Sequence, residues 1–253
     1  MSEVAFDFSG KNFVVVGASS GMGREIALEL AAAGASVLAV ARNKERLAAL
    51  QEKYPEQIKT AIMDVLAAND DLWWETLDPF VAAHGKINGG VYTAGISGTT
   101  PLKQYEKRLA NDIFDTSFSG AMQFIHSASR KKISEVGASF VLFSSVAAYA
   151  GTKGLLFYAG AKAAVQTAAK VISKEIAGRR QRINSVSPAW VKTPMTEKYQ
   201  KDYSPPKEVY EAQYLGEIEP DGVSGMVLFL LSERARFITG QDFVIDGGFL
   251  AGR

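Results

Sequence analysis

The chain has 253 residues, of which 47% are hydrophobic and 22% charged, and its formal net charge is +1. Such a balance can fill a large core and favours neither nucleic acid nor an acidic membrane surface as partner. Cysteine is absent, which excludes disulfides and thiolate metal sites, and the two histidines lie far apart in the sequence, so we expect no metal. The first ten residues lack a secretory signal, and no stretch reaches the ~18 apolar residues of a membrane span. These features predict a soluble, cytoplasmic protein.

A glycine-rich turn follows the first predicted strand. Phe13 to Val16 is an apolar, β-branched run typical of a strand buried on both faces. It leads into Gly17-Ala18-Ser19-Ser20-Gly21-Met22-Gly23, and a helical pattern then continues to Gly34. Strand, glycine turn and helix in this order predict a site where dinucleotide phosphates approach backbone amides at a helix N-terminus. A flexible linker is the alternative interpretation.

Arg42 follows the second predicted strand, residues 37–41. Dinucleotide folds place an acid about 20 residues after the glycine turn to hold a ribose 2′-hydroxyl. No Asp or Glu occurs from Gly34 to Lys44. A guanidinium at this place suits a 2′-phosphate, which it can bind through two hydrogen bonds. We therefore predict NADP(H) in preference to NAD(H), the alternative being a solvated Arg42 that only opens the next helix.

Further strands are expected to end at Met63, at Tyr92, at Phe143, at Val186 and at Ile245. Between them the sequence predicts helices near residues 71–83, 111–132, 155–177 and 223–231. Strands that alternate with helices predict an α/β fold with a doubly wound, Rossmann-like parallel sheet. We expect one domain over residues 1–253, with residues 196–219, rich in tyrosine and charge, as a substrate lid or else a solvated excursion.

Ser145, Tyr158 and Lys162 form the predicted catalytic group. Tyr158 and Lys162 are four residues apart and would share one face of a helix. A nearby ammonium lowers the pKa of a phenol, which could then exchange a proton with an alkoxide or alcohol. Ser145 ends a strand at the sheet edge where ligands bind, and it could hold a carbonyl oxygen. An ordinary surface Tyr/Lys pair is the alternative.

With these residues in view, the chain resembles the short-chain dehydrogenase/reductase family from Phe8 to Gly248. The ordered set GxxxGxG, Ser145 with Tyr158 and Lys162, and Ser187-Pro188 through Thr193-Pro194 carries the resemblance. It implies a seven-stranded parallel sheet, a nicotinamide cofactor and a tetramer or dimer. The tyrosine would act as acid/base, the serine would orient the carbonyl, and the lysine would bind the nicotinamide ribose.

The resemblance also implies the cofactor contacts. They would come from the glycine turn, from the ends of the following strands, from the catalytic pair and from the segment after the sixth strand. These residues are Gly17, Ser19, Ser20, Gly21, Met22, Gly23, Arg42, Asp64, Val65, Ala94, Gly95, Tyr158, Lys162, Pro188, Ala189, Val191 and Thr193.

The sequence departs from the family pattern at three places. Tyr92-Thr93-Ala94-Gly95 replaces Asn-Asn-Ala-Gly, Ser117 replaces the asparagine of a proton-relay water site, and Ala189 replaces glycine. A serine can still bind a water, so Ser117 stays a catalytic candidate, although it lacks the donor pair of an amide. The same replacements would suit a protein that binds NADP(H) without turning it over.

The leading hypothesis is an NADP(H)-dependent oxidoreductase that interconverts a ketone or aldehyde and an alcohol by hydride transfer. Among small-molecule substrates we favour a 3-oxoacyl thioester or a similar ketone. The alternative from another class is a non-catalytic NADP(H)-binding sensor or scaffold. A dehydratase or epimerase that recycles its nicotinamide is a third possibility, and it fits the glycine spacing less well.

Overall fold

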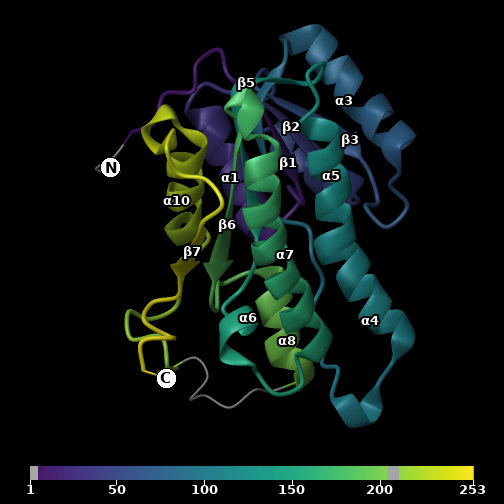
Figure 1. The fold of residues 1–253 in the computed structure, drawn as a ribbon, viewed down its shortest axis with the longest axis vertical. Coiled ribbons are helices and arrows are strands. Elements are labelled where there is room, and N and C mark those ends of the chain that lie inside the picture. The colour runs from purple at the N-terminus through teal and green to yellow at the C-terminus, as the bar shows by residue number, and fades with distance from the viewer. Residues whose placement is uncertain (1–4, 204–210, 253) are drawn as a thin grey trace.

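A parallel seven-stranded sheet forms the centre of the protein (Figure 1). The structure is a computed structural model that describes residues 5–203 and 211–252. The strand order is β3-β2-β1-β4-β5-β6-β7, as the doubly wound prediction requires. The strands are β1 (Asn12–Val16), β2 (Ser36–Ala41), β3 (Ile58–Ile62), β4 (Ile87–Tyr92), β5 (Ser134–Phe143), β6 (Arg182–Pro188) and β7 (Asp242–Ile245).

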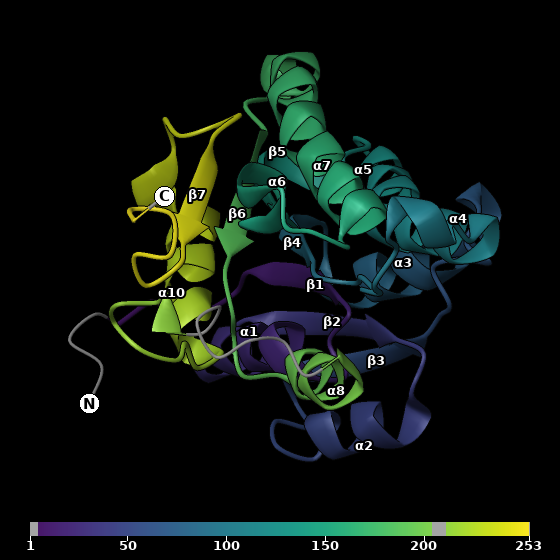
Figure 2. The same ribbon diagram turned by 90° about the horizontal axis from the view of Figure 1, so that it is seen from below.

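Helices connect the strands and cover both faces of the sheet. They are α1 (Gly21–Ala32), α2 (Lys44–Gln51), α3 (Asp70–His84), α4 (Lys107–Phe114), α5 (Gly120–Ala128), α6 (Ala147–Ala150), α7 (Leu156–Glu175), α8 (Pro194–Tyr203) and α10 (Asp221–Leu231). Short 3₁₀ turns occupy Leu102–Gln104, Ala177–Arg179 and Glu233–Ala235. Figure 2 shows α3, α4, α5 and α7 on one face of the sheet, and α1, α2 and α10 on the other.

Side-chain alternation along β1 explains the two layers. Phe13 and Val15 pack in a core with α1 and α10, while Val14 and Val16 pack in a second core with α3, α5 and α7. All four are at most 1% exposed, because a parallel strand under helices on both faces has no polar side. Trp73, fully buried on α3, belongs to the second core, which confirms the expectation that at least one tryptophan of this helix packs inside.

The strand order creates the crevice in which ligands of such sheets bind. The chain winds from β1 outward to β3 and then returns, so that β4 pairs with β1 on its other side. The loops after β1 and β4 therefore leave the sheet in opposite directions at its carboxyl edge. Arg42, Asp64, Ser145 and Ala189 follow β2, β3, β5 and β6 at this same edge.

The helix predicted over residues 111–132 differs in the structure. It begins earlier, as α4 at Lys107, and α5 ends at Ala128. Between the two helices, Asp115–Ser119 forms a π-helical turn, which a pattern of apolar residues does not reveal. The turn contains Ser117. Within residues 5–203 and 211–252, no helix is long and apolar enough to cross a membrane.

Candidate active site

The glycine turn after β1 is a close contact of backbone against backbone. A Cβ on Gly23 would lie 2.4 Å from the Gly17 carbonyl oxygen and 2.4 Å from Thr93 Oγ1, so only glycine fits there. Gly17 has a φ of +89°, which side chains other than glycine rarely tolerate. Ser20, the residue that caps α1, makes no side-chain bond to the helix. The first amides of α1 thus remain available to an anion.

Thr93 is a residue whose role the sequence did not reveal. Its hydroxyl donates a hydrogen bond to the Val16 carbonyl at 2.8 Å, and the same atom fills the space beside both Gly17 and Gly23. The side chain therefore joins the end of β1 to the loop after β4, and it sets how closely the glycine turn and that loop approach. Its position next to Ala94-Gly95 was the only sequence signal.

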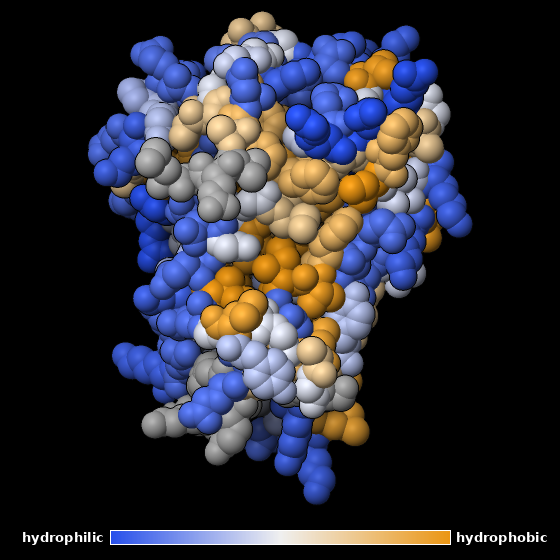
Figure 3. All heavy atoms as spheres, turned by 90° about the vertical axis from the view of Figure 1, so that its left-hand side faces the viewer, coloured by the Kyte–Doolittle hydropathy of each residue, from blue (hydrophilic) through white to orange (hydrophobic). Residues whose placement is uncertain are grey.

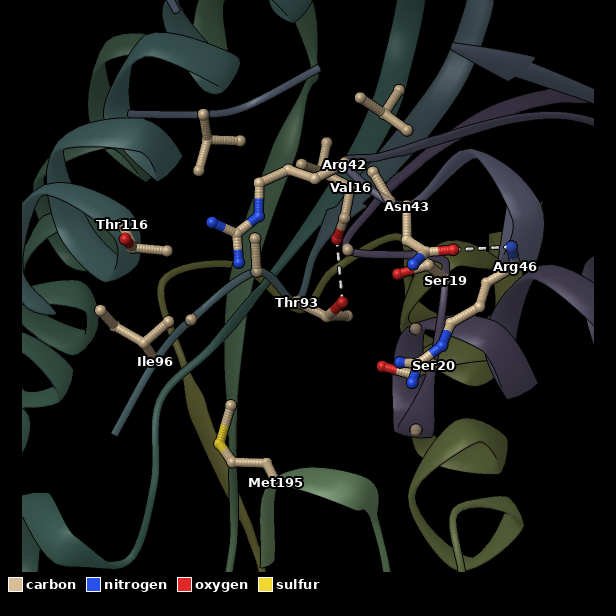
Figure 4. Close-up of a pocket in the computed structure, with 18 of the residues that line it drawn as sticks. Val16, Ser19, Ser20, Arg42, Asn43, Arg46, Thr93, Ile96, Thr116 and Met195 are labelled. Atoms are coloured by element: carbon tan, nitrogen blue, oxygen red, sulfur yellow. Dashed lines mark hydrogen bonds between the residues drawn. The ribbon is translucent and has the colours of Figure 1, made fainter. Parts of the chain in front are cut away.

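A cleft of about 520 Å³ opens at this edge (Figure 4). Twelve of the predicted cofactor residues line it: Gly17, Ser19, Ser20, Gly21, Met22, Gly23, Arg42, Asp64, Val65, Ala94, Gly95 and Thr193. Residues that the sequence did not predict also line it, among them Asn43, Arg46, Thr93, Ile96, Thr116 and Met195. The glycines and strand ends are therefore brought together as the sequence predicts.

The remaining predicted residues lie outside the lining of this cleft. Pro188 ends β6, and its carbonyl accepts a hydrogen bond from the amide of Val146, next to Ser145, at 3.1 Å. The Ala189 amide donates to the Ile245 carbonyl at 3.1 Å. Val191 is 2% exposed and belongs to the core, with its backbone bridged to Ile218. The backbone of residues 188–191 is therefore bound along β7 and the loop before α10.

Two arginines lie at the end of the cleft beside β2. Arg42 Nη1 is 3.7 Å from Asp64 Oδ2, and both side chains are substantially exposed. Arg46 lies in the first turn of α2, and its amide donates a hydrogen bond to the Asn43 side chain, which caps the helix, at 2.8 Å. Figure 4 shows Arg42 and Arg46 with Ser19 and Ser20 around the same opening. Arg46 lies four residues after Arg42, and the sequence analysis did not identify it.

Ser145, Tyr158 and Lys162 lie together at the end of β5. The Ser145 side chain lies near enough to the Tyr158 hydroxyl to lower its pKa. Lys162 Nζ lies 5.7 Å from the centre of the Tyr158 ring. It donates a hydrogen bond to the Phe143 carbonyl at 2.8 Å, and in return Ser144 Oγ donates to the Lys162 carbonyl at 2.9 Å. This reciprocal pair of bonds fixes α7 against the end of β5.

Burial controls the ionisation of the pair. Desolvation raises the pKa of Tyr158, and the nearby Ser145 side chain opposes that rise. Lys162 is 5% exposed, and burial lowers its pKa to about 8. The expectation that Lys162 holds the pKa of Tyr158 below its usual value is thus wrong for this structure, because burial raises that pKa and the Lys162 amine is directed to the Phe143 carbonyl. The Tyr158 phenol therefore stays protonated at neutral pH, and the pKa of the Lys162 amine comes close to neutral pH.

Ser117 reaches the same group from the π-helical turn. A Cβ on Gly95 would lie 3.4 Å from Lys162 Nζ and 3.4 Å from Ser117 Oγ, so both polar atoms face one small space beside Gly95. Ser117 is 1% exposed, and its hydroxyl has no hydrogen-bond partner among the described residues. A buried hydroxyl in this state has room to bind a water or ligand atom.

Asp242 on β7 ties the segment after Ser145 to the edge of the sheet. Its carboxylate accepts hydrogen bonds from the Tyr149 hydroxyl and from Ser187 Oγ, each at 2.7 Å, and also from Ser185. Burial and the neighbouring carboxylate raise the pKa of Tyr149 to about 12. Because Tyr149 belongs to α6, the carboxylate anchors this short helix, which begins two residues after Ser145.

A family model described as "Enoyl-(Acyl carrier protein) reductase", of the short-chain dehydrogenase type, matches residues 17–250. The chain belongs to the short-chain dehydrogenase/reductase family. Among curated relatives of this family, L-xylulose reductase of Caenorhabditis elegans is 31% identical over 96% of this chain and 97% of its own. A 3-oxoacyl-(acyl-carrier-protein) reductase of Thermotoga maritima is also 31% identical, over 95% of this chain and 98% of its own.

Solved structures of short-chain dehydrogenases agree with the fold. A short-chain type dehydrogenase/reductase from Mycobacterium ulcerans has a TM-score of 0.88 and 28% identity, over 97% of this chain and 92% of that one. Actinorhodin polyketide ketoreductase, solved with NADPH, has a TM-score of 0.86 over 97% and 99% of the two chains. At 23% identity the latter likeness concerns the fold alone. The protein is therefore a short-chain dehydrogenase/reductase, an oxidoreductase enzyme.

Proposed function

We propose that this short-chain dehydrogenase/reductase is an NADP(H)-dependent enzyme that interconverts a ketone or aldehyde and an alcohol. The observation that carries the proposal is the grouping of Ser145, Tyr158 and buried Lys162 at the sheet edge where the glycine cleft opens. The cleft fits a dinucleotide, since it opens at the N-terminus of α1, where Ser20 makes no side-chain cap and leaves the first helix amides to a pyrophosphate. When bound, the cofactor supplies or accepts the hydride.

The chain's own residues account for the proton. Ser145 Oγ holds the carbonyl oxygen of the substrate by a hydrogen bond and keeps it against the Tyr158 hydroxyl. Tyr158, whose pKa burial raises, is protonated and serves as general acid toward the developing alkoxide. Lys162, with its pKa near 8, can return a proton to Tyr158 at neutral pH, and Ser117 holds the water that resupplies Lys162. In the oxidative direction the same groups accept the proton from the alcohol.

Replacing the Tyr158 hydroxyl tests this assignment. Tyr158→Phe keeps the ring beside Lys162 and removes the acid, so turnover should fall by about 10²- to 10⁴-fold while NADPH binding stays unchanged. The assay follows the oxidation of NADPH with a panel of carbonyl compounds, at roughly 340 nm, where the reduced nicotinamide absorbs. Wild-type rates from the variant would refute the role of Tyr158. A wild-type protein that binds NADPH and reduces no carbonyl would instead favour a sensor.

NADP(H) preference is proposed from Arg42 and Arg46, two guanidinium groups at the end of the cleft beside β2. Both can hold a 2′-phosphate, and no Asp or Glu occurs from Gly34 to Lys44 to bind a 2′-hydroxyl. Arg42→Asp should weaken NADPH binding by about 10- to 100-fold, as expected for one lost charged contact, and should spare NADH. The check is a fluorescence titration of both nucleotides. NADH binding as tight as NADPH in the wild type would overturn the preference.

The substrate is proposed to be a 3-oxoacyl thioester or a similar ketone. The reductase from Thermotoga maritima supports the thioester, while the L-xylulose reductase relative keeps sugar ketones in the panel. Part of the proposed lid, residues 204–210, lies outside the described residues. On the described side, the rings of Trp190 and Tyr199 are tilted against each other with centres 5.6 Å apart, and the Trp190 amide donates a hydrogen bond to Gln213 Oε1 at 2.6 Å. These contacts support a lid built on α8.

Assembly as a homodimer or homotetramer is proposed from the edge strand. Within the described residues β7 pairs only with β6, and Val244 is 41% exposed. Figure 3 shows an apolar patch on the side of the molecule that carries β7 and α10. A second copy that pairs here would cover the strand edge. Light scattering of the purified protein tests this, and a monomer at micromolar concentration would exclude it.

A further inference from the structure

Tyr92 reaches the π-helical turn from the neighbouring strand. Its hydroxyl, at the end of β4, donates a hydrogen bond to the Thr116 carbonyl at 2.7 Å. The side chain is 2% exposed, and its ring lies 6.1 Å from that of Phe124 on α5. Burial raises the pKa of Tyr92, so the hydroxyl stays a donor at any working pH. The bond is therefore a permanent part of the folded protein.

This hydrogen bond takes an acceptor that a regular helix would use itself. In an α-helix the amide of Gly120 would donate to the Thr116 carbonyl, four residues earlier. Here the Gly120 amide donates instead to the Asp115 carbonyl, five residues earlier. The Tyr92 hydroxyl thus occupies the place of the helix amide at Thr116. A side chain from the sheet thus replaces one main-chain hydrogen bond of the helix, and the helix forms a wider π turn at this point.

Gly120 is the counterpart of Tyr92. A Cβ on Gly120 would lie 2.3 Å from the Tyr92 hydroxyl oxygen, closer than real atoms approach, and 3.2 Å from the Asp115 carbonyl. Any side chain at position 120 would therefore push the hydroxyl off the Thr116 carbonyl. The large residue at 92 and the absent side chain at 120 are matched, although 28 positions separate them in the sequence.

The turn held in this way carries Ser117 into the catalytic group. Ser117 is adjacent to Thr116, its hydroxyl is without a partner among the described residues, and it shares the space beside Gly95 with Lys162 Nζ. If the turn relaxed to an α-helix, Gly120 would recover Thr116 as acceptor, and the residues before it would rotate relative to β4. Ser117 would then leave the space beside Lys162.

We propose that Tyr92, together with Gly120, is a positioning residue that holds the π turn and so places Ser117 against Lys162. The inference rests on the proposed function for its kinetic consequence, since Ser117 is assigned to proton resupply there. It does not rest on that function for its structural part. Tyr92 touches neither substrate nor cofactor in this assignment, and it acts through Ser117 alone.

Tyr92→Phe is the direct test, with Ser139→Ala as matched control. Both remove a buried hydroxyl that donates to a main-chain carbonyl at close range, but the Ser139 bond goes to Leu230 at 2.8 Å on the opposite face of the sheet. Tyr92→Phe should lower kcat by up to about tenfold through displacement of Ser117, no more than Ser117→Ala does, with KM for NADPH unchanged. Ser139→Ala should lose comparable thermal stability and keep the wild-type kcat. Equal kcat values for the two variants would overturn the inference.

Hydrogen exchange separates this inference from the proposed function. In Tyr92→Phe the amides of residues 115–121 should exchange faster than in the wild type and in Ser139→Ala, because the turn loses its anchor. This readout needs no substrate. Unchanged protection would overturn the inference even for an active enzyme. Faster exchange in a protein that reduces no carbonyl would support the positioning role and refute the proposed function.

A second pair of variants tests the match between positions 92 and 120. Gly120→Ala should lower the melting temperature and kcat, since its Cβ meets the Tyr92 hydroxyl. Adding Tyr92→Phe removes the atom that clashes, so the double variant should melt higher than Gly120→Ala alone. Purely additive losses in the double variant would show that the two residues are not coupled, and would overturn the pairing.

Discussion

The two sides of the cleft are built by different means. At the glycine turn, Gly17 and Gly23 bring main chain against main chain, and the geometry follows from the lack of side chains. At the π turn, Tyr92 crosses from the sheet and changes the hydrogen bonding of a helix. The first arrangement depends on neighbours in the sequence and the second on a distant partner. Cofactor binding and proton resupply should therefore fail through different substitutions, and the predictions below test this separation.

Among the substitutions that separate the two sides of the cleft, Lys162→Met should give the largest effect on kcat. It should act on the side that carries Tyr158 and Lys162, and not on the glycine turn. Loss of the amine beside Tyr158 should lower kcat by about 100-fold or more. The same variant should be more stable than the wild type at pH 7, by about 2 kcal/mol, because a buried charge is replaced by an apolar chain. Chemical denaturation of both proteins checks the second claim, and a less stable variant at pH 7 would contradict it.

The stability difference should also depend on pH. Burial lowers the pKa of Lys162 to about 8, well below its value in an unfolded chain. Between pH 8 and pH 10 the unfolded state therefore binds more protons than the folded state, and wild-type stability should rise relative to Lys162→Met. Below pH 8 the difference should be constant. A difference that stays flat up to pH 10 would show that the folded pKa of Lys162 is not depressed.

Gly23→Ala should disrupt the glycine turn and so weaken cofactor binding. Its Cβ would meet the Gly17 carbonyl, so we expect a loss of about 2 kcal/mol in stability and NADPH binding weakened at least tenfold. Gly225→Ala is the control, because this glycine on α10 has open space around it and alanine should stabilise the helix slightly. Calorimetry and nucleotide titration measure both. NADPH affinity at the wild-type level would refute the close-contact account of the turn.

Ser117→Ala should give the smallest effect. It removes one hydroxyl from the space beside Lys162, and kcat should fall by roughly tenfold or less, with nucleotide affinity unchanged. Ser127→Ala is matched to it, since Ser127 on α5 is also a buried hydroxyl with no partner among the described residues. Steady-state kinetics of the two variants decide the point. Identical kcat values would remove Ser117 from the catalytic group.

Most of the fold could be predicted because its signals are local. Strands β1, β2, β5 and β7 contain short apolar runs, and the parallel order follows from the helices between the strands. The glycine turn could be located because strand, turn and helix adjoin in the sequence. The positions of Ser145, Tyr158 and Lys162 followed from the shared carboxyl edge, and the structure brings them together.

What could not be predicted depends on contacts between distant residues. The π turn at Asp115–Ser119 has the apolar spacing of an ordinary helix, and only the Tyr92 hydroxyl from β4 distinguishes it. Thr93 contacts two glycines that lie about 70 or more positions earlier in the sequence. Arg46 lines the cleft because of the direction in which α2 starts. The ionisation of Tyr158 was misjudged because burial raises its pKa, and burial is a tertiary property that the spacing of Tyr158 and Lys162 does not reveal.

The carboxylate of Asp242 has a consequence for synthesis of the protein. Tyr149, four residues beyond Ser145, is bonded to an acid on β7 that follows it by 93 residues in the chain. A growing polypeptide that has passed Lys162 already contains Ser145 and Tyr158, yet it still lacks the partner that anchors α6. Domains gain their final contacts as units when the last elements join. Activity should therefore be absent from nascent chains that end before β7, and it should arise only once β7 has been made.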